Sequence, residues 1–392
     1  MRTGVVIHLN RFKENINTVK TRVGKTIRIC VPVKADAYGH GALQISKAAL
    51  EAGAYCLGVA DVMEGIDLRK GGIQAPILLF SQAHPNEIPL IIKAKLIPFV
   101  SDEEFAAALN KQAELEKIKL PVHIKIDTGM NRMGCPLNEV LALAGMIKNS
   151  SSLELEGTAT HLAVSDSANK SDIDFTNVQL ARFKKAVTAI KNAGIDPGII
   201  HAANSGAVIL HPNAWLDMVR PGILLYGYKT VQEYEAPVDH LKKISKLSSI
   251  IVKPVMELKS SVSLIKKIKK GDSVSYGRTW TAKKDTTICI LSIGYADGLP
   301  RLASNRWQVV INGEAYPLVG RITMDQCCVD LGSNTNIKRW DEAIIFGDDI
   351  YPEQPKKSAI MQNAAELASL VRTIPYEITC NVSKRVKRIY KL

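Results

Sequence analysis

The sequence contains no apolar run of the roughly 20 residues that a membrane-spanning helix needs. Its first stretch, MRTGVVIHLNRF, lacks the continuous apolar core of a secretion signal, so we expect a cytoplasmic protein with no membrane partner. Low-complexity tracts and internal repeats are also absent. Together with 46% hydrophobic and 23% charged residues, this excludes a disordered or fibrous chain and predicts an ordered globular protein.

The chain also lacks the usual signatures of metal and nucleic-acid binding. Its seven cysteines are scattered without metal-site spacing, so we expect core cysteines and no bound metal. No zinc finger, RNA-recognition signature or basic patch interleaved with aromatic residues is present. The net charge of +13, concentrated at 266–270 and in the stretch SKRVKRIYKL, permits an acidic partner. We interpret it as a solvated surface and expect no nucleic-acid partner.

The first half of the chain has the pattern of a parallel sheet with crossover helices. Short runs rich in β-branched residues alternate with longer helical patterns such as ALQISKAALEAG. The predicted strands are residues 27–33, 56–60, 77–80, 97–100, 122–127, 155–161, 199–203 and 218–219. Eight such units are the number that closes a (β/α)8 barrel. An open doubly wound sheet would give a similar pattern and is the alternative.

The second half has a different periodicity. After about residue 242 come short alternating runs, VKPVMEL, TTICILSIG, WQVVINGEAYPL, CCVDLG and EAIIFG, followed by a helical pattern, SAIMQNAAELASLV. Asn312 and Gly313 lie between two apolar runs and both tolerate positive φ, which predicts a hairpin turn. At 392 residues the chain also exceeds a typical single core. We therefore predict an α/β fold with a (β/α)8 barrel domain, residues 1–240, and a mostly β C-terminal domain, residues 241–392.

The ends of the predicted barrel strands carry the candidate chemistry, because active sites of barrels lie there. The first strand runs into Lys34 in VPVKADAYGHG. An isolated strand-end lysine usually only extends its amine to water, but in a partly desolvated mouth it loses its preference for the charged form, as an imine-forming amine must. The loops 203–206 (ANSG) and 220–223 (RPGI) have small residues that let backbone N–H groups approach an anion. We therefore expect a phosphorylated cofactor.

Six segments, VKADAYGHG, HAANSGA, RPGILLYGY, SVSYGRTW, SIGYADG and VGRITMDQ, closely resemble the alanine racemase family in the same order along nearly the whole chain. The resemblance implies interconversion of L- and D-alanine by a head-to-tail homodimer that uses pyridoxal phosphate. It also implies that Lys34 holds the cofactor as an internal imine and acts as the base on one face of the substrate. Tyr276 of the partner subunit would be the base on the other face.

The resemblance assigns further roles around these two groups. Arg220 would face the pyridine nitrogen, and His201 would bridge Arg220 and Tyr276 by hydrogen bonds, with His161 nearby. Because a guanidinium cannot accept a proton, the ring would be a weaker electron sink, which favours racemisation over transamination. The implied cofactor-binding residues are Lys34, Tyr38, His161, Asn204, Ser205, Arg220, Gly222, Ile223 and Tyr376. The implied substrate-binding residues are Arg132 and Met324, supported by Lys125, His201, Tyr295 and Asp325.

Some implications concern specificity. Lys125 matches a lysine that is carbamylated in some relatives, and Tyr295 and Tyr376 resemble a pair of phenols that narrow the entrance for a small substrate. Thr323 stands where relatives commonly have Cys, and the stretch HLAVSDS departs from the commoner sequence. Three alternatives stay open: a racemase of broader or serine specificity, a barrel decarboxylase with the same cofactor, and a non-catalytic carrier of pyridoxal phosphate.

Overall fold

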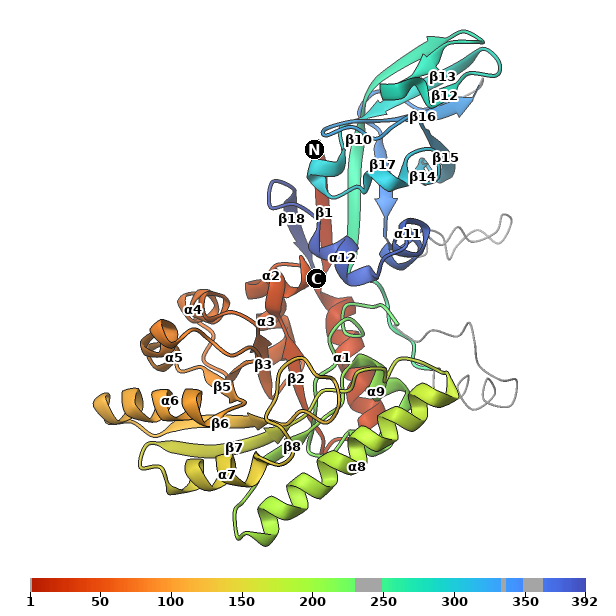
Figure 1. Ribbon diagram of the computed structural model, residues 1–392. Coiled ribbons are helices and arrows are strands. Elements are labelled where there is room, and N and C mark those ends of the chain that lie inside the picture. Colours follow the sequence, from red (N-terminus) through yellow and green to blue (C-terminus); the bar gives the residue numbers. More distant parts are fainter. Residues whose placement is uncertain (1, 230–248, 333–335, 348–361) are drawn as a thin grey trace.

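The computed structural model describes residues 2–229, 249–332, 336–347 and 362–392 (Figure 1). Eight parallel strands form a closed barrel, in which β9 pairs back with β2 through Arg28 and Met218. The strands are β2 (Arg28–Pro32), β3 (Cys56–Val59), β4 (Ile77–Leu79), β5 (Ile97–Val100), β6 (Leu120–Lys125), β7 (Leu153–Ala159), β8 (Ile199–His201) and β9 (Met218–Val219). Closure confirms the predicted barrel and excludes the open sheet.

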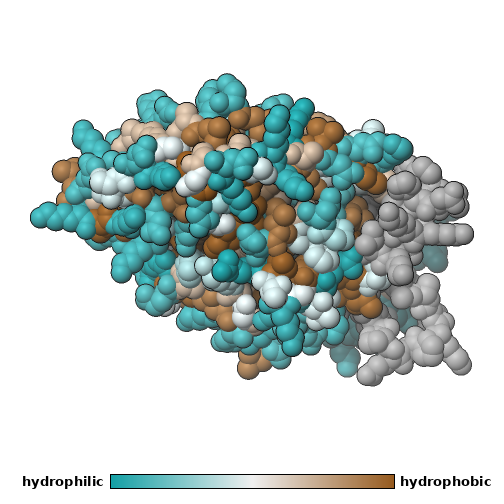
Figure 2. All heavy atoms as spheres, turned by 90° about the horizontal axis from the view of Figure 1, so that it is seen from below, coloured by the Kyte–Doolittle hydropathy of each residue, from teal (hydrophilic) through white to brown (hydrophobic). Residues whose placement is uncertain are grey.

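Helices cover the outside of the barrel because their apolar residues recur three and four positions apart. In α1, for example, Phe12, Ile16, Val19 and Val23 form one buried face. The helices are α1 (Leu9–Val23), α3 (Ala42–Glu51), α4 (Val62–Lys70), α5 (Ile88–Lys93), α6 (Glu103–Leu115), α7 (Val140–Asn149), α8 (Lys170–Asn192) and α9 (Ser205–Leu210). Hydrophilic and hydrophobic side chains are interspersed over the face that the barrel presents in Figure 2.

The second domain is built on an eight-stranded sheet with the order β13-β16-β15-β14-β17-β10-β1-β18. Asn312 and Gly313, with φ of 48° and 87°, form the predicted hairpin turn between β14 and β15. The strands are β1 (Thr3–His8), β10 (Met256–Ile268), β13 (Thr286–Leu291), β14 (Gln308–Ile311), β15 (Glu314–Val319), β16 (Cys327–Gly332), β17 (Glu342–Phe346) and β18 (Lys387–Lys391), with β11 (Ser273–Val274) and β12 (Trp280–Thr281) in a small separate sheet. The helices α11 (Ala364–Val371) and α12 (Pro375–Cys380) follow.

The first strand of the chain belongs to this second sheet and not to the barrel. β1 pairs antiparallel with β10 and parallel with β18, and Figure 1 shows it inside the β domain. The assignment of residues 1–240 to the barrel is therefore wrong for residues 3–8, because a short buried strand carries no local signal of its distant partners. The predicted boundary between residues 240 and 241 lies outside the described residues.

The two domains meet beside the barrel mouth. Helix α12 of the β domain packs against the segment α2 (Lys34–Tyr38), and the rings of Tyr376 and Tyr38 have centroids 5.5 Å apart. Among the residues that the structure describes, no helix combines the length and apolar character that crossing a membrane requires.

Candidate active site

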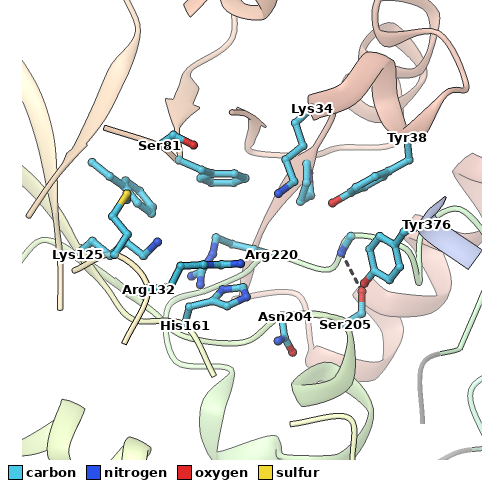
Figure 3. Close-up of a pocket in the computed structure, with 15 residues that line it drawn as sticks. Lys34, Tyr38, Ser81, Lys125, Arg132, His161, Asn204, Ser205, Arg220 and Tyr376 are labelled. Atoms are coloured by element: carbon cyan, nitrogen blue, oxygen red, sulfur yellow. Dashed lines mark hydrogen bonds between the residues drawn. The ribbon is translucent and has the colours of Figure 1, made fainter. Parts of the chain in front are cut away.

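A cavity of about 450 Å³ opens at the carboxyl ends of the barrel strands (Figure 3). It brings together ten of the predicted site residues, namely Lys34, Tyr38, Lys125, Arg132, His161, Asn204, Ser205, Arg220, Gly222 and Tyr376. The other lining residues are Pro32, Phe80, Ser81, Phe99 and Met133. No lining residue in the described part of the chain is acidic, whereas four are lysine or arginine. The cavity therefore suits an anionic ligand.

Strand β2 ends at Pro32, and Lys34 is the first residue of the left-handed turn that follows. The four residues after it, 35–38, have φ between 51° and 54°, although none is glycine. Lys34 and Tyr38, at the two ends of this turn, both point into the cavity (Figure 3). Burial lowers the pKa of the Lys34 amine, and the positive charge of Arg132 lowers it further. More of the amine is therefore neutral, and so nucleophilic, than in a solvated lysine.

Neutral hydrogen-bonding groups gather at the other end of the cavity. Ser205 Oγ accepts hydrogen bonds from the backbone N–H of Gly222 at 2.9 Å and of Leu224 at 3.2 Å. The Tyr376 hydroxyl bonds to Ser205 and to the backbone of Ile223, while burial raises its pKa to about 12. A Cβ at position 222 would lie 2.8 Å from the Tyr38 hydroxyl, so the approach of this backbone requires glycine.

Asn204 has a structural role beside this group. Its Oδ1 accepts from the backbone N–H of Ala207 at 3.0 Å, which caps α9, and from the Ser165 hydroxyl at 2.6 Å. The asparagine thereby fixes the start of α9, where Ser205 begins the helix. Its contribution to the site is to hold Ser205 in the cavity wall.

Arg220 is buried, and its guanidinium is held by neutral acceptors. It donates to the carbonyls of Thr160 at 2.7 Å and Ala202 at 3.3 Å, and to His201 Nδ1 at 2.5 Å. Because a guanidinium only donates, His201 Nδ1 must accept, and the proton of this imidazole lies on Nε2. That nitrogen is 2.8 Å from His123 Nδ1, to which it donates. Burial lowers the pKa of Arg220 to about 10, so it stays positively charged near neutral pH.

The predicted bridge from His201 to Tyr276 is wrong. Both ring nitrogens of His201 are occupied, by Arg220 and His123, and the ring is fully buried, so no phenol can reach it. His201 ends the barrel strand β8, as predicted, but its ring is buried against His123 of β6. His161 instead lines the cavity beside Arg220 (Figure 3), and burial keeps its pKa well below the ordinary value.

Sequence reasoning missed His123, which continues the chain of contacts from Arg220. Side chains two residues apart on a strand share a face, so the position of His123 two residues before Lys125 was the available signal. The two residues lie in β6 and are both buried.

Apart from Tyr376, the predicted residues of the β domain lie outside this cavity. Tyr276, Met324 and Tyr295 expose 72%, 53% and 44% of their surface. Tyr276 begins a short 3-10 turn between β11 and β12, which lie at the end of the β domain remote from the barrel (Figure 1). Asp325 is half-buried, and its carboxylate pairs with Arg385 at 2.8 Å.

The loops that carry these residues pack against one another. Ser275 Oγ donates to the carbonyl of Arg321 at 2.6 Å, beside Tyr276. The backbone N–H of Tyr295 donates to the carbonyl of Thr323 at 3.0 Å, beside Met324. Tyr276, Tyr295, Met324 and Asp325 therefore belong to one connected group of loops, which we call the β-domain loop cluster.

Two family models together match most of the chain. Residues 7–230 match the alanine racemase N-terminal domain, and residues 255–390 match the alanine racemase C-terminal domain. The chain is 48% identical over 388 residues to the alanine racemase of Treponema denticola, covering 99% of this chain and 98% of that protein. It is 41% identical over 389 residues to the alanine racemase of Treponema pallidum, covering 98% of each.

Solved structures agree with the sequence relatives. The alanine racemase of Clostridium difficile 630 superposes with a TM-score of 0.87 at 34% identity, covering 100% of this chain and 96% of that one. The alanine racemase of Bartonella henselae, solved with covalently bound pyridoxal phosphate, superposes with a TM-score of 0.83 at 28% identity and covers 100% of both chains. By its two domains, its full-length relatives and its fold, the chain belongs to the alanine racemase family, whose reaction interconverts L- and D-alanine.

Proposed function

We propose that the enzyme racemises alanine with pyridoxal phosphate joined to Lys34, and that Lys34 and the partner subunit's Tyr276 exchange the Cα proton from opposite faces. The observation that carries this proposal is the cavity itself. The cavity contains the desolvated amine of Lys34, and the neutral hydroxyls of Ser205 and Tyr376 lie at its other end. The cationic Arg220 is part of the same cavity wall.

The residues of the cavity fit this cofactor. The hydroxyls of Tyr38, Ser205 and Tyr376, with the backbone of Gly222 and Ile223, form a neutral group of hydrogen-bonding partners that would hold the phosphate. Burial raises the pKa of the tyrosine hydroxyls, which therefore keep the protons that they donate to a dianion. When bound, the cofactor withdraws electrons from the Cα–H bond of an attached amino acid and makes its proton removable by ordinary side chains.

Arg220 accounts for the choice of reaction. Its three polar partners, His201, Thr160 and Ala202, are neutral, so nothing in these contacts removes its charge. Arg220 would hold the pyridine end of the cofactor, where a permanent cation would disfavour protonation of the ring nitrogen. This would favour return of the proton to Cα over transamination.

Lys34 and Tyr276 take the two faces because no single loop can surround the substrate. Because burial lowers the pKa of Lys34, a larger share of its Nζ is neutral and able to accept a proton than in a solvated lysine. A phenol that enters the cavity meets the basic side chains of Lys125, Arg132 and Arg220. His161 is the neutral imidazole at the mouth, and we assign to it the hydrogen bond to the phenol that sequence reasoning gave to His201.

The substrate carboxylate would bind to Arg132 and to the backbone N–H of the partner's Met324. Arg132 lines the cavity and Met324 lies on the β-domain loop cluster with Tyr276, so this pairing again requires a second subunit. Together with Tyr376 of the cavity and the partner's Tyr295, which would narrow the entrance, this pairing fits a small side chain. Comparison of kcat/KM for alanine and serine tests this specificity, and a preference for serine would contradict it.

Tyr276→Phe and Lys34→Ala test the two assigned roles. Tyr276→Phe should retain the visible absorbance of the lysine-bound cofactor and lose racemisation by about 10²–10⁴-fold, the range of one acid–base group. Lys34→Ala should lose that absorbance as well as activity. Unchanged turnover in Tyr276→Phe would remove this phenol from the mechanism, and retained absorbance in Lys34→Ala would place the cofactor on another amine.

A further inference from the structure

The turn that carries Lys34 has an unfavourable backbone. L-residues avoid the left-handed region because Cβ crowds the following carbonyl, and single residues visit it far more often than runs do. Here Ala35, Asp36, Ala37 and Tyr38 occupy it consecutively. The surrounding structure must therefore hold the turn, or Lys34 and Tyr38 would lose their common orientation toward the cavity.

One support comes from α4. Glu64 Oε1 accepts a hydrogen bond from the backbone N–H of Ala35 at 2.5 Å. Its Oε2 accepts from the N–H groups of Ala60 at 2.9 Å and Asp61 at 3.3 Å. The carboxylate therefore joins the first residue of the turn to the start of α4. Glu64 is not among the residues that line the cavity.

A second support comes from β18 of the other domain. Arg388 Nε donates to the carbonyl of Gly39, directly after the turn, at 3.1 Å. Its Nη1 donates to the carbonyls of Ser383 and Val386 and its Nη2 to that of Val382, at 2.8 to 2.9 Å. With four hydrogen bonds to backbone carbonyls, this guanidinium is a fixed link between the β domain and the end of the turn.

We infer that Glu64 and Arg388 are positioning residues that clamp the left-handed turn at its two ends and so set Lys34 Nζ against Tyr38 Oη. The inference rests on the proposed role of Lys34 in holding the cofactor. Neither residue touches the reacting atoms. The nearby charge of Glu64 also acts on the amine, because it raises the pKa of Lys34 against the lowering by burial.

Glu64→Gln tests the clamp with little change in volume. The glutamine amide keeps one acceptor oxygen, but its NH2 group would face a backbone N–H of Ala35, Ala60 or Asp61. Two donors cannot bond to each other, so at least one of the three hydrogen bonds is lost. We expect about 10–100-fold weaker binding of pyridoxal phosphate, the usual effect of removing a support behind a ligating group. In the holoenzyme, kcat should fall more than KM changes, and the cofactor absorbance should titrate at a shifted pH. Amide hydrogen exchange in residues 34–41 should accelerate.

Asp61→Ala is the matched control. Asp61 caps the same helix by accepting from the N–H of Met63 at 2.7 Å, a hydrogen bond that lies within the first turn of α4. This variant should lose stability and keep the cofactor affinity, the absorbance titration and the exchange of residues 34–41. Arg388→Lys, which keeps the charge and loses the fork, should reproduce the Glu64→Gln effects from the other end.

The clamp is refuted if both Glu64→Gln and Arg388→Lys bind the cofactor and exchange as the wild type does, or if Asp61→Ala reproduces their losses. These outcomes are distinct from a failure of the proposed function. If Lys34→Ala kept the cofactor absorbance, the proposed role of Lys34 in holding the cofactor would be refuted, independently of the results for Glu64→Gln and Arg388→Lys. If Lys34→Ala lost the absorbance and those two variants behaved as the wild type, only the clamp would be refuted.

Discussion

At the scale of single residues, the surroundings of Lys125 disfavour its positive charge. Burial lowers its pKa to about 8, and the positive charges of Arg220, Arg132 and Lys34 add to the effect, against only Asp127. Because Arg220, Arg132 and Lys34 are already positively charged, a negatively charged group at position 125 would be more favourable than a fourth positive charge. The carbamate that the family resemblance implies for Lys125 would supply one, facing Arg132.

The pKa of Lys125 predicts a stability change with pH. Below about pH 8 the amine is charged in the folded and the unfolded chain, and folding bears the full cost of burying that charge. Between about pH 8 and the unfolded pKa of ~10.4 the folded chain releases the proton first, so stability rises with pH in this window. Relative to Lys125→Met, the wild type should gain about 1–3 kcal/mol, at roughly 1.4 kcal/mol per pKa unit.

Urea unfolding of both proteins in buffer freed of CO2 checks this expectation. Repetition with bicarbonate should abolish the difference if Lys125 becomes carbamylated, because the titrating amine is then gone. Parallel pH curves for the two proteins in both buffers would show that Lys125 does not titrate in this window.

At the scale of elements, α1 joins the end of the barrel to the start of the β domain. Asn15 is buried on α1, and its Nδ2 donates to the carbonyls of Leu225 at 3.0 Å and Lys253 at 2.9 Å. Its Oδ1 accepts from the N–H of Lys253 at 2.9 Å. One side chain therefore satisfies three backbone groups on two segments that are far from α1 in sequence.

Asn15→Leu should destabilise the protein by about 2–4 kcal/mol, because it removes the partner of one buried and two part-buried backbone groups. Asn192→Leu, at the exposed end of α8, is the control and should change stability by less than about 0.5 kcal/mol. Denaturant unfolding measures both. Equal effects of the two substitutions would mean that water or a shifted backbone replaces the Asn15 contacts.

At the scale of the whole molecule, the predicted active-site residues form two separate groups. Lys34 lies in the cavity of the barrel, while Tyr276 is exposed on the β-domain loop cluster. A head-to-tail homodimer, which we propose, would place the loop cluster of each subunit over the barrel mouth of the other.

Mixed dimers test this arrangement directly. Lys34→Ala and Tyr276→Phe chains, each inactive alone, should regain activity when mixed and allowed to exchange subunits. Random exchange makes about half of the dimers mixed, and each has one intact site of two, so about a quarter of the wild-type activity is expected. A mixture as inactive as its components, despite demonstrated exchange, would mean that both residues act within one chain.

The sequence by itself determined what depends on local periodicity and turn chemistry. Eight strands of the barrel, the Asn312-Gly313 hairpin and the position of Lys34 at the end of the first barrel strand follow from alternation of apolar residues and from backbone preferences, which are properties of neighbouring residues. The six family segments add the order of the site residues along the chain.

Only the tertiary structure decided which residues from distant segments meet. The pairing of β1 with β10 and β18, the burial of His201 against His123, the exposure of His161 to the cavity and the contact of Arg388 with Gly39 each join positions far apart in sequence. Local pattern contains no information on such partners, because it sets the face on which a side chain lies and not what lies opposite that face. Which of the two predicted histidines, His161 or His201, lines the cavity was therefore decided only by the folded chain.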